Sequence, residues 1–299
     1  MMADISTLHG LAAALALVTA PASSQSAVPR APTDKWVVDF ADSQCTATRN
    51  YGSADKPLFL LFKPAPMGSV MQVAVLRKGK SGETAQVDAK LSVDQGQAID
   101  TSLLAFTARK QGRRVNVINL QLDTFDQVRE AKVLSISAAG EVNESFALTD
   151  VVPLMKAVDM CLADLRRVWN VGEAHNGRIK EGGGPKANLG SYFNADDYPD
   201  VAISGGETGT VELAMLIDEA GKIADCTVVA TSGAAALDAQ SCAVLTERAK
   251  FRPAVGNDGK PVKSSLTQRI RWDLENLRSH REYGNERPAA PLASPPTDR

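Results

Sequence analysis

The sequence predicts an α+β protein in which a β-rich first domain ends in one packed helix and a small α/β domain follows. Apolar and polar residues alternate in short runs between residues 36 and 148, and one helical stripe then covers residues 154–169. After a glycine-rich break, the pattern is helix, strand, strand, helix, strand, which predicts a small antiparallel sheet with helices. With 299 residues, the chain is long enough for two domains that each bury a core.

The composition argues against a nucleic-acid partner. The net charge is −2 and only 5% of the residues are aromatic, so there is neither a strong positive field nor a set of rings on which bases could stack. We therefore expect a globular protein without nucleic acid.

The N-terminus indicates export. Residues 8–20 form an uncharged apolar run, and residues 21–27 are mostly small and polar. At about 1.5 Å per residue, this run is too short to cross a hydrocarbon core of about 30 Å, which favours a signal peptide over residues 1–27. Because no Lys or Arg precedes the run, a short uncleaved anchor or a different start are the alternatives.

The first domain is expected over residues 34–171. Strands are predicted at residues 58–62, 87–93, 115–118, 133–136 and 142–148, where β-branched and other apolar residues alternate with polar ones or form short runs. A helix follows, because Leu154, Val158, Cys161, Leu165 and Trp169 share one face at helical spacing. This face must pack on the strands.

A Gly-rich, nearly apolar-free segment follows, and we expect a flexible linker over residues 172–192. Because such a linker offers no apolar surface to join the domains, the two domains are expected to fold independently. Residues 276–299 are rich in Arg, Pro and Ala and are predicted to be a disordered tail.

The second domain is expected over residues 193–275. A short helix at 200–204 precedes a strand at 211–217, and a turn at residues 218–221 leads into a second strand at 226–230. An amphipathic helix at 237–249 and a last alternating strand at 262–272 complete the pattern.

Four cysteines are present, at positions 45, 161, 226 and 242, and none lies in a Cys-x-x-Cys pair. This spacing gives no metal site, and an even number of cysteines in an exported chain indicates disulfides. Of the three pairings that four cysteines allow, the domain division selects Cys45–Cys161 and Cys226–Cys242, since each then joins a β segment to a helix of its own domain.

The second domain resembles the TonB C-terminal family. The resemblance rests on short motifs in the right order: Tyr198-Pro199, Gly209, Asp218-Glu219-Ala220-Gly221-Lys222-Ile223, Ser232-Gly233, Leu237-Asp238, Phe251-Arg252-Pro253-Ala254 and Asp258-Gly259-Lys260-Pro261-Val262. It implies a non-enzymatic envelope module whose last strand pairs with an extended segment of an outer-membrane receptor in energy-coupled transport. The physical mode is strand addition, in which main-chain hydrogen bonds provide adhesion and alternate side chains provide selectivity.

The strand that matches this role carries Lys263, Ser265, Thr267, Arg269 and Arg271 on one side. Its cationic residues suit an acidic or polar partner strand. The alternative is an ordinary edge strand that Lys and Arg protect against aggregation.

The chain departs from an energy transducer in two respects, because its leader is short and a folded domain stands where a Pro-rich spacer is expected. The second hypothesis is therefore an exported structural, docking or dimerisation protein without an energy-transducing role. In both cases the resemblance implies the periplasm of a Gram-negative envelope, with an inner-membrane anchor if the leader is not cleaved. The expected partner is an outer-membrane receptor, another envelope protein or a second copy of the chain.

Catalytic and metal-binding patterns are weak. The three histidines, His9, His175 and His280, all lie outside the predicted domains, so neither domain has a histidine base or ligand. We expect no enzyme, no metal, no cofactor and no small-molecule substrate. An enzyme confined to the first domain is the third hypothesis.

Overall fold

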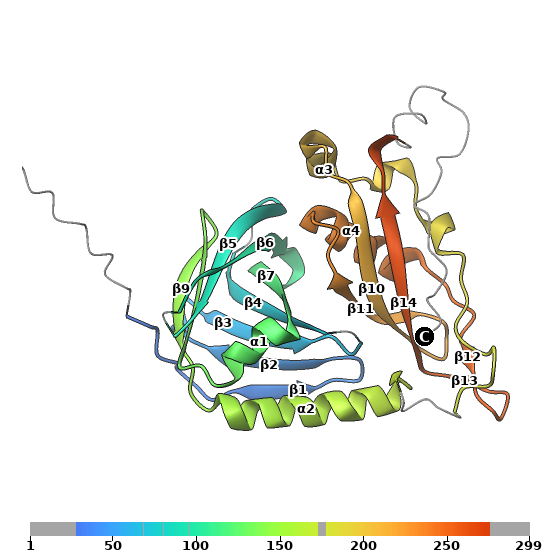
Figure 1. The fold of residues 1–299 in the computed structure, drawn as a ribbon, viewed down its shortest axis with the longest axis horizontal. Coiled ribbons are helices and arrows are strands. Elements are labelled where there is room, and N and C mark those ends of the chain that lie inside the picture. The colour runs from blue at the N-terminus through green and yellow to red at the C-terminus, as the bar shows by residue number, and fades with distance from the viewer. Residues whose placement is uncertain (1–27, 68, 80, 95, 173–177, 276–299) are drawn as a thin grey trace, which may run out of the picture.

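The computed structural model describes residues 28–275, apart from residues 68, 80, 95 and 173–177. It confirms the α+β class: a nine-stranded sheet with two helices is followed by a three-stranded sheet with two helices and a small two-stranded pair (Figure 1). Within these residues, no helix combines the length and the apolar character needed to span a membrane. The predicted leader, residues 1–27, and the predicted tail, residues 276–299, lie outside the described residues.

The first domain is one strongly curved antiparallel sheet, in the order β1-β2-β3-β4-β7-β6-β5-β8-β9. Its strands are β1 (Val37–Phe40), β2 (Cys45–Asn50), β3 (Leu58–Pro64), β4 (Val70–Lys78), β5 (Ala85–Val93), β6 (Ile99–Ala108), β7 (Arg113–Gln121), β8 (Val133–Ala138) and β9 (Val142–Ala147). The segment before β1 links the two ends of the sheet: Arg30 bonds to β9 through its main chain, and the amide of Thr33 donates to the carbonyl of Asn50 on β2 at 3.0 Å. The sheet therefore encloses its own core.

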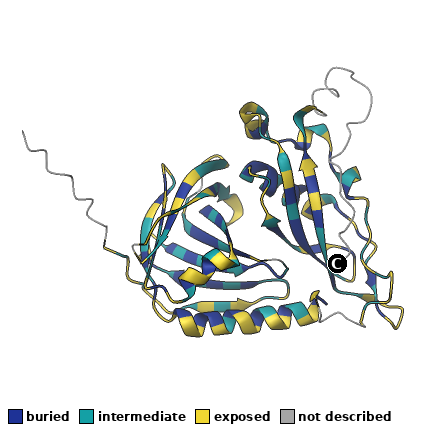
Figure 2. Ribbon diagram, in the orientation of Figure 1, coloured by how far each residue is buried: buried dark blue, intermediate teal, exposed yellow. Residues whose placement is uncertain are grey.

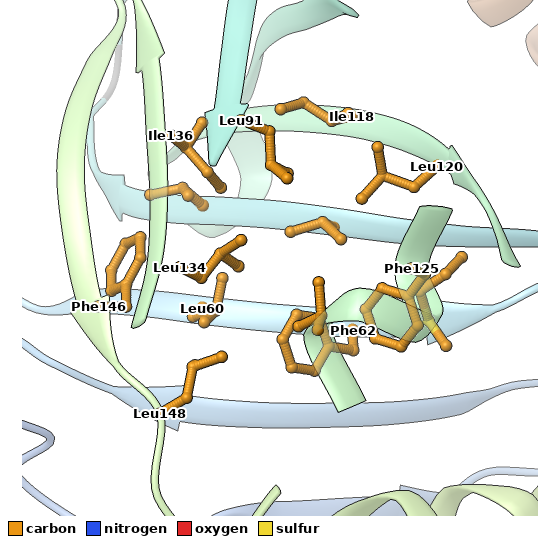
Figure 3. Close-up of a cluster of buried hydrophobic side chains, with 14 of the residues drawn as sticks. Leu60, Phe62, Leu91, Ile118, Leu120, Phe125, Leu134, Ile136, Phe146 and Leu148 are labelled. Carbon is orange, nitrogen blue, oxygen red and sulfur yellow. The ribbon is translucent and has the colours of Figure 1, made fainter. Parts of the chain in front are cut away.

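Alternation along the strands explains this core. On β3, every second residue from Leu58 to Pro64 is buried. Figure 3 shows inward side chains of several strands, among them Leu60, Leu91 and Ile136, in one cluster with Phe62, whose ring meets that of Phe125 of α1 (Leu122–Arg129) edge-on. The curved sheet and the short helix thus bury a single apolar cluster.

The helix α2 (Val151–Val168) confirms the predicted helical stripe. It lies along β1 and β2, and its buried side includes Leu154, Val158 and Leu165 (Figure 2). The predicted disulfide Cys45–Cys161 joins this side to the first residue of β2.

The second domain also follows the predicted order. It contains α3 (Asp200–Gly205), β10 (Gly209–Ile217), β11 (Ile223–Ala230), α4 (Ala235–Arg248) and β14 (Ser264–Trp272), and its sheet has the order β11-β10-β14. At the turn between β10 and β11, Asp218 Oδ1 accepts from the amides of Ala220 and Lys222 at 2.9 and 2.8 Å, which explains the acidic residue there. The predicted disulfide Cys226–Cys242 joins β11 to α4.

Part of the predicted linker, within the described residues 178–192, is bonded to the second domain through its main chain. The amide of Lys180 donates to the carbonyl of Val255 at 2.9 Å, and Lys186 and Arg252 exchange two main-chain hydrogen bonds. A Cβ at Gly183 would lie 2.9 Å from the carbonyl oxygen of Val255, so the glycine permits this close approach. The segment therefore runs as an extra strand-like layer beside β12 (Ala254–Val255), which pairs with β13 (Pro261–Val262).

Candidate protein-binding edge

The strand β14 forms one edge of the sheet in the second domain. It pairs with β10 in antiparallel register, with Ala214 opposite Thr267 and Glu212 opposite Arg269. No strand in the described part of the chain pairs with its other side. In Figure 1, β14 faces away from the first domain, whereas β11 faces toward it.

Period-two alternation fixes the orientation of β14. Ile270 and Trp272 point into the core under α4, where the indole nitrogen of Trp272 donates to Ser241 Oγ at 2.8 Å. The ring of Tyr198 meets the ring of Trp272 edge-on, with 5.2 Å between their centres. Tyr198 therefore has a packing role, and Arg269 and Arg271 are directed to the opposite, exposed face.

The exposed arginines are not free cations. Arg269 Nε lies 2.9 Å from a carboxylate oxygen of Glu212, and Arg271 lies 3.1 Å from Asp273. Two carboxylates thus compensate two guanidinium groups. The cationic face that the sequence suggested is closer to neutral, because Glu212 on β10 and Asp273 after β14 fall beside the arginines.

Two of the other predicted partner-binding residues contact the first domain. The ammonium group of Lys263 lies 4.8 Å from the ring centre of Trp169, and the hydroxyl of Thr267 lies 4.0 Å from the sulfur of Met67. Ser265 is half-buried between them along the strand. The side-chain face of the edge is therefore free of the first domain only beyond Thr267, where Arg269 and Arg271 are the most exposed side chains.

The opposite edge of the sheet is occupied by the first domain. Lys63 of β3 forms an ion pair of 2.6 Å with Asp225 of β11, and both side chains are largely buried. The side chain of Gln86 on β5 donates to the carbonyl of Gly233 at 3.0 Å, just beyond the end of β11. Of the two edges, β14 is the one that these contacts leave open.

An apolar junction also joins the domains. Leu216 of β10 is fully buried in a cluster with Cys45, Cys161, Leu165 and Trp169. The apolar contact between the domains thus comes from the sheet and not from the linker, and independent folding of the two domains stays a prediction. Sequence reasoning missed this junction, although β10 is buried on both faces from Leu213 to Ile217, which produces a continuous apolar run with Ala214 and Leu216.

The described residues show no assembled metal site. No group of three or more His, Cys, Asp or Glu side chains is placed to hold a metal ion there, and His9, His175 and His280 lie outside those residues. The acidic pair at 196–197 has a structural role: Asp197 accepts from the amide of Asn194 in a capping box and forms an ion pair of 2.7 Å with Arg248.

The geometry defines a small α/β domain that presents one open edge strand while a second domain occupies its other edge. Residues 194–274 match the family described as the Gram-negative bacterial TonB protein C-terminal, which agrees with the resemblance seen in the sequence. No curated protein and no solved structure matches the chain.

Proposed function

We propose that this chain is a TonB-like protein-binding module of the Gram-negative envelope, located in the periplasm, and that the open edge of β14 pairs with an extended segment of an outer-membrane receptor or another envelope protein. The observation that carries the proposal is the asymmetry of the sheet: the first domain contacts β11, whereas no described strand pairs with the far side of β14. An edge strand is a template for strand addition, because its main-chain groups on one side lack a ladder partner.

Main-chain pairing extends from Ser265 to Arg271, and recognition by side chains falls to Arg269 and Arg271, since Lys263 contacts Trp169 and Thr267 contacts Met67. Along this stretch, Arg269 and Arg271 can exchange their intramolecular carboxylates for acidic groups of a partner. Both arginines are more than half exposed, at 54% and 62%, so this exchange costs little. Main-chain pairing supplies most of the affinity. Through this pairing, the domain takes part in energy-coupled transport by the receptor.

Binding of receptor-derived extended peptides to the full chain tests the proposal. Thr267→Pro removes one main-chain donor from β14 and should reduce the affinity about tenfold or more if that donor faces outward. Arg269→Glu with Arg271→Glu tests the side-chain face. Lys156→Glu with Arg167→Glu is the matched control, because it makes the same change of charge on the exposed side of α2. Circular dichroism establishes that each variant is folded.

The proposal predicts weaker binding for the β14 variants and unchanged binding for the α2 control. Equal affinity of the folded arginine variant and the wild type for every receptor peptide would remove this face from the site.

The second candidate is an exported docking or dimerisation protein without an energy-transducing role. The compensated arginines favour it, because a nearly neutral edge can approach a second copy of itself without strong repulsion. Sedimentation of the wild type and Thr267→Pro distinguishes the two: a dimer that the proline disrupts, together with no receptor-peptide binding, supports self-association.

A further inference from the structure

A cavity of about 290 Å³ lies between the two domains. One wall is the outer face of the first sheet, with Leu104 and Phe106 of β6 and Val117 of β7. The other wall belongs to the second domain, with Val228 of β11 and Ala235 and Ala239 of α4. Its size falls near the lower end of cavities that hold small organic molecules.

Contacts between the domains fix the two walls relative to each other. Gln86 donates to the carbonyl of Gly233 at 3.0 Å and accepts from the amide of Ala235, which itself lines the cavity. Asp225, which forms the ion pair with Lys63, directly precedes Cys226, another lining residue. The cavity is therefore bordered by hydrogen bonds and an ion pair between the domains. The disulfide Cys226–Cys242 stiffens the wall that belongs to the second domain.

The lining offers a few hydrogen-bonding groups on an apolar surface. Gln72 and Asn119 are joined by a side-chain hydrogen bond of 3.1 Å. Whichever way the two amides are turned, this bond uses one donor group and one acceptor group, so one carbonyl oxygen and one NH₂ group remain to face a ligand. Both belong to the first domain and lie on its outer face.

The charge of the lining indicates a neutral ligand. The described residues that line the cavity include neither Lys, Arg nor His, so an anion would find no cationic partner. Asp238 is the one ionisable side chain among them, and its two carboxylate oxygens accept from Thr231 Oγ1 at 2.5 Å and from the amide of Ser232 at 2.8 Å. These bonds already occupy the carboxylate, so a cation gains little there.

We propose that this cavity binds a small neutral molecule with an apolar aromatic body and one amide, alcohol or aromatic amine group, which contacts both domains at once. The apolar body lies between Leu104 and Ala239, and the polar group bonds to the Gln72–Asn119 pair. Because the ligand contacts both walls, it stabilises the docked arrangement of the domains by mass action.

The probe for this site is N-phenyl-1-naphthylamine, a neutral aromatic amine whose fluorescence increases in an apolar environment. The full-length wild type should bind it saturably at one site, with a rise in melting temperature. Ala239→Phe fills the cavity and Leu104→Gln makes its apolar wall polar, so each should weaken binding about tenfold or more. Leu76→Gln is the matched control, because Leu76 lines a neighbouring groove on the same sheet, which shares only Phe106 with the cavity, and its change should leave binding unaltered.

Circular dichroism must show native folding for each variant that is compared. If Ala239→Phe does not fold, Leu104→Gln decides, because Leu104 is only partly buried. The proposal is overturned if the wild type gives no saturable fluorescence, or if Leu76→Gln weakens binding while the two cavity variants do not. Weakening confined to the cavity variants supports it.

Discussion

The side-chain nitrogen of Asn170 lies 2.7 Å from the carbonyl oxygen of Lys263, so the residue that follows α2 by two positions is bonded to the residue that precedes β14. Asn170 adopts a left-handed backbone conformation with φ of 53°, which directs its side chain across the domain boundary. In the described residues, Asn170 Oδ1 and Ser264 Oγ are buried without a hydrogen-bond partner. The bond between Asn170 and Lys263 therefore ties the end of the first domain to the start of the proposed binding strand.

The first prediction concerns this junction. Asn170→Gly removes the bond to Lys263 but keeps the left-handed conformation free of strain. Main-chain hydrogen exchange should become faster in a peptide that covers residues 263–267, because the start of β14 loses its anchor. Mass spectrometry of deuterium uptake measures this change, with a peptide that covers β9 as the internal control. Unchanged exchange at 263–267 would show that the bond does not hold this strand.

The second prediction concerns the ion pair between Lys63 and Asp225. Their side chains are only 14% and 9% exposed, so Lys63→Met leaves a buried carboxylate without its partner and should cost about 3 kcal/mol of stability. Urea unfolding measures this loss. Arg129→Met, which breaks the more exposed ion pairs of Arg129 with Asp126 and Asp159, should cost about 0.5 kcal/mol.

A double variant tests whether the effect belongs to the pair. Lys63→Met with Asp225→Leu removes both charges and should be more stable than Lys63→Met alone, since no unpaired carboxylate remains. Equal or greater loss in the double variant would mean that packing, and not the charge pair, holds the domains at this point.

The sequence predicts helices and strands well where one face of the element is exposed to solvent. The alternation of Val87, Ala89, Leu91 and Val93 becomes β5, and the stripe from Leu154 to Trp169 becomes α2, because each element buries one side and exposes the other. The disulfide pairings follow from these faces.

Prediction of strands from the sequence fails where the contact between the domains covers the second face of a strand. On β6, Leu103 and Ala105 point into the first core, while Leu104 and Phe106 face the cavity at the second domain. This strand therefore lacks clean alternation, and the sequence pattern predicts no strand there. Of the five predicted edge residues, four lie in β14 and Lys263 immediately precedes it. The ion pair of Arg269 with Glu212 depends on register with β10, which the pattern of one strand does not contain.

The third prediction ranks the two disulfides. Cys45–Cys161 spans 116 residues and Cys226–Cys242 spans 16. On the chain-entropy estimate, replacing each pair by Ala should cost about 5 and about 3 kcal/mol respectively. The first pair also lies in the apolar junction with Leu216, so its loss weakens the contact between the domains. Urea unfolding of the two double variants measures the order, and a larger loss for Cys226→Ala with Cys242→Ala would contradict the ranking.

The fourth prediction is a pH dependence at Glu141. Hydrogen bonds from Arg114, one of them 3.1 Å long, lower the pKa of Glu141 below its ordinary value of 4.5, although burial opposes the shift. Because the folded-state pKa is depressed, the stabilisation is fully present above pH 4.5 and is lost as the pH falls through the folded-state value. The difference in unfolding free energy between wild type and Glu141→Gln should therefore be constant at neutral pH and shrink on acidification. Urea titrations at a series of pH values measure it.

Asp238 supplies a control of opposite sign for the same titration. Burial raises the pKa of Asp238 above its ordinary value of 3.8, against hydrogen bonds from Thr231 and Ser232 that lower it. Since the folded state then holds its proton more tightly than the unfolded state, the wild type loses stability as the pH rises from 3.8 through the folded-state pKa. Asp238→Asn cannot titrate, so the stability of the wild type relative to this variant should fall over that window, whereas its stability relative to Glu141→Gln should rise with pH below 4.5. Parallel curves for the two comparisons would show that these carboxyl groups do not carry the pH dependence.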